Sequence, residues 1–177
     1  MTAAKLHLKV VTPTRVVVEA DVDEVTLPGA LGALGILPGH APLLCALRIG
    51  ELGYRQGSRE HYLALQWGFA EVAGDGVTVL ADVAELPAEI DVEAARADKL
   101  SAEEALRAAS GPEFEQQRAQ LESAVTRIAV AGNEVAASAP AAALRQVRNT
   151  LQLDYAATAI TLDAAAAAGA GAPLGAD

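Results

Sequence analysis

Residues 29–42 read GALGALGILPGHAP, and this stretch separates two apolar runs in the N-terminal half of the chain. Its three glycines and the Pro-Gly pair at 38–39 shape the backbone, because glycine tolerates left-handed conformations and proline fixes φ. Leu34, Ile36 and Leu37 stand where a solvated loop would be polar. Two interpretations follow: an ordinary connection with buried anchors, or a shaped surface that contacts a partner.

The sequence on both sides of this stretch alternates between apolar and polar residues, which is the period of a β-strand. Leu6, Leu8 and Val10 alternate with polar residues, and Val77 and Val79 flank Thr78. Turn-forming residues separate such runs at short intervals, as at Pro28-Gly29, Gly57-Ser58 and Gly74-Asp75-Gly76. Short antiparallel strands joined in this way predict a β-sandwich or barrel over residues 1–88.

After Pro87 the apolar period becomes that of a helix, which predicts a helical hairpin over residues 89–131. Asp91 is the expected N-cap of the first helix, and Ser110-Gly111-Pro112 is expected to stop it. The second helix is expected to end at Gly132-Asn133 and to carry one apolar face. That face consists of Phe114, Leu121, Val125 and Ile128.

Residues 132–177 form an extension in which we expect a further helix over about 140–166, followed by a mobile Ala/Gly tail. Its apolar stripe either packs on the Leu121, Val125 and Ile128 face of the hairpin or contacts another subunit. The stripe consists of Leu144, Val147, Leu151, Tyr155 and Leu162.

Composition excludes several functional classes. The net charge is −10, and the segments 1–89, 90–131 and 132–177 are each acidic, which argues against nucleic-acid binding and against adsorption to anionic lipid. The single cysteine, Cys45, excludes an internal disulfide framework and fits a reducing compartment. No apolar run is long enough to span a bilayer, so we expect membrane association only through a partner.

Several short motifs occur in a fixed order, and together they resemble the epsilon subunits of F-type ATP synthases over about residues 5 to 131. They are Val11-Thr12-Pro13, the 29–42 stretch, Gly68-Phe69, the VTVLAD run at 77–82, Ala84-Glu85 and Ile90-Asp91. The resemblance implies a ten-stranded β-sandwich followed by the helical hairpin. The chain departs from the family pattern at Trp67, where a second glycine is usual, at Ile49, where proline is common, and at Ala33, where many relatives carry glutamate.

The function that the resemblance implies is mechanical and regulatory. In this family the sandwich docks on the gamma subunit and on the ring of c subunits, and it couples the rotor of a proton-translocating ATP synthase to the catalytic head. The helices of bacterial members can extend toward the alpha/beta head and restrain ATP hydrolysis. The chain is then expected as a peripheral subunit at the cytoplasmic face of the bacterial plasma membrane. The expected interface loop is Leu31, Gly32, Ala33, Leu34, Gly35, Ile36, Leu37, Pro38, Gly39 and His40.

No catalytic constellation is visible, so we expect a non-catalytic protein without a metal or cofactor. Phosphate-binding GxxxxGK[ST] and GxGxxG motifs are absent, and His7, His40 and His61 have no ligand partner at metal-binding spacing. The acidic run Asp21, Asp23 and Glu24 is interpreted as a solvated edge rather than as a catalytic carboxylate pair. Two alternatives remain: a free-standing binding module that uses Gly29–Pro42, and a small enzyme with a cleft between sandwich and helices.

Nucleotide binding needs separate treatment, because some bacterial members bind ATP through an I/L-D-x-x-R-A pattern at the first helix. Here Asp91 is present, but the arginine is delayed to Arg96, and two residues rotate a helical position by about 200°. Ser123 stands where those members often carry arginine, whereas Arg127 is retained. Asp91 and Arg127 are therefore the candidate nucleotide contacts, and we predict that they form no tight ATP site.

Overall fold

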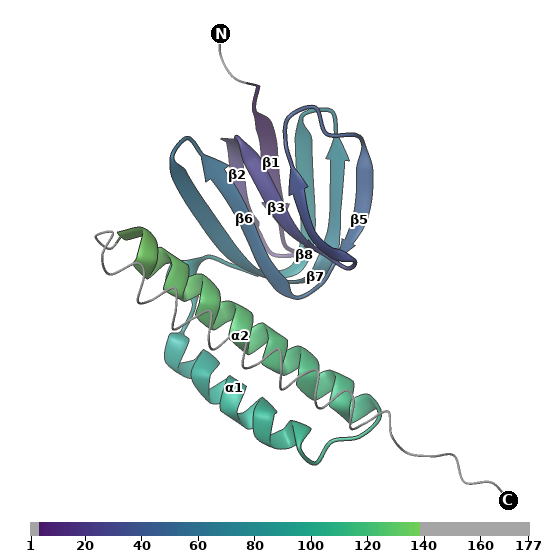
Figure 1. Cartoon of the computed structure of the whole chain (residues 1–177), viewed down its shortest axis with the longest axis vertical. Coiled ribbons are helices and arrows are strands. Elements are labelled where there is room, and N and C mark those ends of the chain that lie inside the picture. The colour runs from purple at the N-terminus through teal and green to yellow at the C-terminus, as the bar shows by residue number, and fades with distance from the viewer. Residues whose placement is uncertain (1–3, 139–177) are drawn as a thin grey trace, which may run out of the picture.

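The computed structural model describes residues 4–138, which form a β-sandwich followed by two helices (Figure 1). The further helix and the Ala/Gly tail expected beyond residue 138 lie outside the described residues. The strands are β1 (Leu6–Val11), β2 (Val16–Val22), β3 (Glu24–Gly29), β4 (Gly32–Ile36), β5 (Leu43–Leu47), β6 (Gly50–Gln56), β7 (Arg59–Ala73) and β8 (Gly76–Glu85). A 3₁₀ turn, η1 (Pro87–Glu89), leads into α1 (Val92–Leu106) and α2 (Pro112–Ser138).

The sandwich has eight strands because β7 and β8 run unbroken through both of its layers. The first part of β7 pairs with β6 and its last part, from Gly68, pairs with β5. The β8 strand follows β7 through both parts, and its first half also pairs in parallel with β1. One layer is thus β2-β1-β8-β7-β5 and the other is β8-β7-β6-β3-β4. The expected count of ten strands was wrong, since that count would need β7 and β8 to be divided at their passage between layers.

The passage of β7 between layers depends on a left-handed step at Trp67 and Gly68. Their φ angles are 46° and 151°, and Trp67 is the one non-glycine residue with a positive φ in the described part of the chain. A Cβ atom at Gly68 would lie 2.2 Å from the carbonyl oxygen of Leu80, so only glycine fits there. The family pattern places a second glycine at Trp67, and this backbone conformation explains why.

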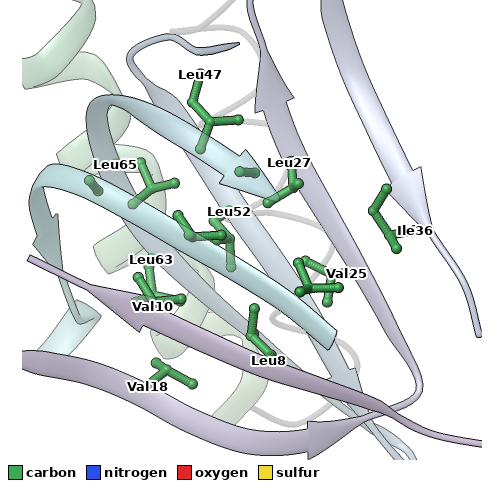
Figure 2. Close-up of a cluster of buried hydrophobic side chains, with 14 of the residues drawn as sticks. Leu8, Val10, Val18, Val25, Leu27, Ile36, Leu47, Leu52, Leu63 and Leu65 are labelled. Atoms are coloured by element: carbon green, nitrogen blue, oxygen red, sulfur yellow. The ribbon is translucent and has the colours of Figure 1, made fainter. Parts of the chain in front are cut away.

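The core lies between the two layers and is almost entirely aliphatic (Figure 2). The cluster includes Leu8 and Val10 of β1, Val25 and Leu27 of β3, and Leu63 of β7. Each of these side chains is fully buried. The alternating apolar positions that predict strands are therefore the inward-facing positions of the layers.

The helices form the predicted antiparallel hairpin, with differences at their ends. Asp91 caps α1 as predicted, since its side chain accepts a hydrogen bond of 3.0 Å from the backbone N–H of Ala94. The second helix does not end at Gly132-Asn133, as predicted, but continues to Ser138. A single glycine costs a helix only about 1 kcal/mol, and packing on the sandwich on either side of Gly132 outweighs that cost.

The hairpin has a small core of its own. Ala102 and Leu106 of α1 pack against Leu121 and Val125 of α2, and Phe114 covers one end. Leu121 and Val125, which were expected to receive the extension, thus serve to join the two helices.

We predict that Gly68→Ala lowers the free energy of unfolding by roughly 3 kcal/mol or more, because the alanine methyl group would overlap the backbone of β8. Gly35→Ala is the matched control, since a Cβ atom at Gly35 meets nothing within 4 Å. Chemical denaturation of both variants checks this expectation. Equal stabilities would show that the step in β7 accommodates a side chain.

Candidate functional site

The predicted interface loop is divided in the structure into a turn, a strand and a second turn. Leu31 lies at the tip of the tight turn between β3 and β4 and is fully exposed, whereas Ile36 is fully buried in the core. The five residues of β4 separate this tip from Leu37, which is exposed at the other end of the strand, by roughly 20 Å. His40 forms a 2.8 Å hydrogen bond from Nδ1 to the carbonyl oxygen of Ala41. Leu31 and Leu37 therefore present apolar side chains at two separate places.

An apolar row crosses the outer face of the β2-β1-β8-β7-β5 layer. The strand registers place Phe69 opposite Leu80, and both side chains are more than half exposed. The row continues to Ala46 of β5 on one side and to Val11 and Val16 on the other. Val16 joins it because a β-bulge between Val10 and Val11 shifts the pairing of β2. Exposed rows of this length are uncommon on soluble monomers and mark contact surfaces.

Trp67 lies beside this row, two residues before Phe69 on β7, and lines an open groove of about 660 Å³. Its side chain is 50% exposed. Ala30 of the β3–β4 turn borders the same groove, and Arg48 and Asp82 supply charged groups. Trp67 was not among the predicted site residues, although its presence where the family usually has glycine was a signal. A large aromatic side chain kept in a strained backbone conformation at the surface indicates a function for that side chain.

The β1–β2 side of the same outer face is charged and internally paired. Asp21 lies 3.0 Å from His7, and Lys9 lies 3.3 Å from Glu19 across the β1–β2 ladder. Asp23 binds Lys5, and this contact lowers the pKa of the Asp23 carboxyl below its ordinary value. The acidic run at 21–24 is therefore a set of surface ion pairs, and its carboxylates are not paired with each other.

The hairpin lies on the outer face of the other layer, where α2 packs on β6 and β7 through a narrow apolar seam. Ala64 of β7 and Ile90 pack against Val130 and Ala131 of α2, with Tyr62 at the margin. This seam contains two alanines among its four buried residues, whereas the sandwich core is built of leucine and valine. Since hydrophobic stabilisation scales with buried apolar area, the hairpin is held much more weakly than the layers hold each other.

Polar contacts flank the seam along α2. Arg127 Nε lies 2.9 Å from an oxygen of Glu85 at the end of β8, and its Nη1 lies 3.5 Å from Asp98 of α1. Asn133 donates a 2.7 Å hydrogen bond to Glu51 of β6. Burial raises the pKa of the Glu51 carboxyl, and the hydrogen bond from Asn133 offsets only part of this effect.

The two candidate nucleotide contacts already have other partners. The carboxylate of Asp91 caps α1, and the guanidinium of Arg127 pairs with Glu85. Arg96 is exposed and pairs with Glu93 on its own helix, at 3.1 Å. Within the described residues, no group of three His, Cys, Asp or Glu side chains could hold a metal ion. None of the described helices is long and apolar enough to cross a membrane.

Comparison with known proteins assigns both parts of this structure. Residues 5–87 match the family model of the ATP synthase delta/epsilon chain β-sandwich domain, and residues 88–132 match that of its long α-helix domain. This chain belongs to the ATP synthase epsilon chain family. As an epsilon chain it is a non-catalytic subunit of ATP synthase.

Individual relatives agree with this assignment. The ATP synthase epsilon chain of Geobacter sp. (strain M21) is 48% identical over 132 residues, which are 73% of this chain and 96% of the relative. The epsilon chain of Geotalea uraniireducens (strain Rf4) is also 48% identical, over 131 residues. A chain of the Euglena gracilis mitochondrial ATP synthase has the same fold, with a TM-score of 0.61 at 22% identity over 68% of this chain and 77% of that one. This epsilon chain is thus longer than its bacterial relatives at its C-terminal end.

We predict that Glu51→Gln stabilises this epsilon chain at neutral pH. The pKa of Glu51 is raised above its ordinary value of 4.5, so the carboxyl favours folding when protonated, and this contribution is lost as the pH rises through the raised pKa. Glutamine still accepts the hydrogen bond from Asn133 and carries no charge. The difference in unfolding free energy between variant and wild type should therefore grow as the pH rises from about 4 to 7.

Denaturation at a series of pH values measures this difference. Glu71→Gln, on the exposed outer face of the other layer, is the matched control, and its difference should stay near zero. A Glu51→Gln difference that is constant with pH would contradict the expected effect of burial.

Proposed function

We propose that this epsilon chain is a central-stalk subunit whose sandwich docks on the gamma subunit and on the c-ring, at the cytoplasmic face of the plasma membrane. The observation that supports this most strongly is the exposed apolar row of Phe69 and Leu80 with Trp67 beside it. On the opposite outer face the hairpin already packs on β6 and β7, whereas this row has no covering element among the described residues. An aromatic anchor with apolar neighbours is the usual centre of a protein interface.

The two kinds of surface suit two partners. The apolar row and the groove beside it offer a broad face, which we assign to gamma. Leu31 is the exposed tip of the β3–β4 turn, next to Ala30, which borders that groove. It offers a small contact, which we assign to the polar loop of the c subunits. Ala33 places no charge beside that tip, so this contact is apolar rather than an ion pair.

The hairpin supplies a regulatory element. Its thin alanine-rich seam means that the docked and released states differ by only a few kcal/mol, and contacts with the alpha/beta head are then able to compete for it. The proposal includes no tight ATP site, because Asp91 and Arg127 have protein partners and Arg96 pairs with Glu93.

We predict that Trp67→Gly weakens binding to the purified gamma subunit by about tenfold or more while stability changes by about 1 kcal/mol or less. Glycine adopts the left-handed conformation without strain, so the backbone step is retained when the indole is removed. Phe69→Ala should weaken binding in the same direction. Titration calorimetry for binding and thermal unfolding for stability separate the two effects.

Leu100→Ala is the control for exposed apolar residues in general, because Leu100 is 67% exposed on α1. Its affinity for gamma should equal that of the wild type. If Trp67→Gly and Phe69→Ala also bind gamma with wild-type affinity, the assigned face is wrong.

A second prediction concerns the hairpin. A chain truncated after residue 89 keeps every strand of the sandwich and should assemble into the ATP synthase with proton coupling intact. ATP hydrolysis by the assembled complex should rise, because the inhibitory element is absent. Unchanged hydrolysis would reduce the hairpin to a structural role, and failure to assemble would show that the sandwich alone is not the docking unit.

A further inference from the structure

Within the described residues, Arg127 of α2 is the one residue that forms ion pairs both with the sandwich and with α1. Its Nη2 donates a 3.2 Å hydrogen bond to one carboxylate oxygen of Glu85. Its Nε lies 2.9 Å from the other oxygen but does not have the geometry of a hydrogen bond. Its Nη1 also lies 3.5 Å from Asp98 of α1. One carboxylate thus belongs to the sandwich and the other belongs to the hairpin itself.

The two carboxylates differ in their surroundings. Glu85 and Arg127 are each about one-fifth exposed, whereas Asp98 is 62% exposed. The Glu85 contact is therefore the stronger contact while the hairpin is docked, because it includes a charge-assisted hydrogen bond and both groups are partly desolvated. Asp98 adds little attraction in that state and repels Glu85, since both carboxylates approach the same guanidinium.

Release of the hairpin would change this balance. Glu85 stays with the sandwich and becomes hydrated, while Asp98 leaves together with Arg127 because α1 and α2 remain packed through their own core. Removing one partner of a buried ion pair normally leaves a costly unpaired charge. Here the arginine keeps a carboxylate partner in both states.

We propose that Arg127 exchanges its partner from Glu85 to Asp98 when the hairpin leaves the sandwich, and that this exchange sets the docking equilibrium. The proposal rests on the proposed function only in that the hairpin is released. It assigns opposite roles to two acidic residues that contact the same arginine: Glu85 favours docking and Asp98 favours release.

The test measures docking in the isolated full-length chain with a buried thiol. Ala131→Cys, in a Cys45→Ser background, places a thiol in the seam, where labelling by a thiol reagent requires release of the hairpin. Glu85→Gln should speed labelling about tenfold, as expected for the loss of a hydrogen-bonded charge pair. Asp98→Asn should slow labelling about two- to threefold, because it removes both the competing carboxylate and the partner in the released state.

Two controls make the result specific. A thiol at Ala102, inside the α1–α2 core, reports opening of the hairpin itself, and its labelling should change much less than that of the Ala131 thiol. Glu71→Gln removes a charge from the other layer and should leave both rates unchanged. The two test substitutions are nearly isosteric, so the fold is retained.

The proposal is overturned if Asp98→Asn speeds labelling as Glu85→Gln does, because Asp98 would then simply support the docked state. It is also overturned if neither variant changes the rate, or if the Ala102 thiol responds as strongly as the Ala131 thiol. ATP hydrolysis by the complex with the truncated chain is a separate measurement. If Glu85→Gln and Asp98→Asn have opposite effects on labelling but truncation leaves hydrolysis unchanged, the partner exchange of Arg127 stands and the regulatory role of the hairpin is wrong.

Discussion

The left-handed step at Trp67 and Gly68 is the constraint on which the arrangement of this molecule depends. It lets β7 leave one layer and enter the other while it keeps its register with β8 on both sides of Trp67, and the two layers are thereby closed around one core. Gly68 is required because β8 leaves no room for a Cβ atom. Trp67 adopts its left-handed conformation at a cost in strain, and this conformation places the indole beside the apolar row.

The closed sandwich has two outer faces, and they are used differently. One face is covered by α2 through a seam of small side chains, which stays weak because it buries little apolar area. The other face keeps an exposed apolar row beside a charged and internally paired region. A rigid platform with one weakly held appendage and one open apolar face fits a subunit that must dock firmly and still respond to its surroundings.

The polar contacts beside the seam also position the hairpin without holding it tightly. The carboxylates of Glu51 and Glu85 project from the sandwich toward α2 and meet an amide and a guanidinium. Contacts of this kind orient the hairpin with little net stabilisation, since desolvation of the carboxylates offsets much of their attraction. The hairpin is therefore positioned accurately without being held tightly.

The sequence by itself determined the order of elements and the inward positions of the strands, because period-two alternation and the N-cap at Asp91 are local properties. It also identified the family, through short motifs in a fixed order. Only the tertiary structure decided that Leu31 and Leu37 lie at opposite ends of β4, that Ile36 belongs to the core, and that β7 serves both layers. The partners of Arg127 and the apolar row likewise join residues distant in sequence, because strand register and helix packing are long-range properties that no local pattern encodes.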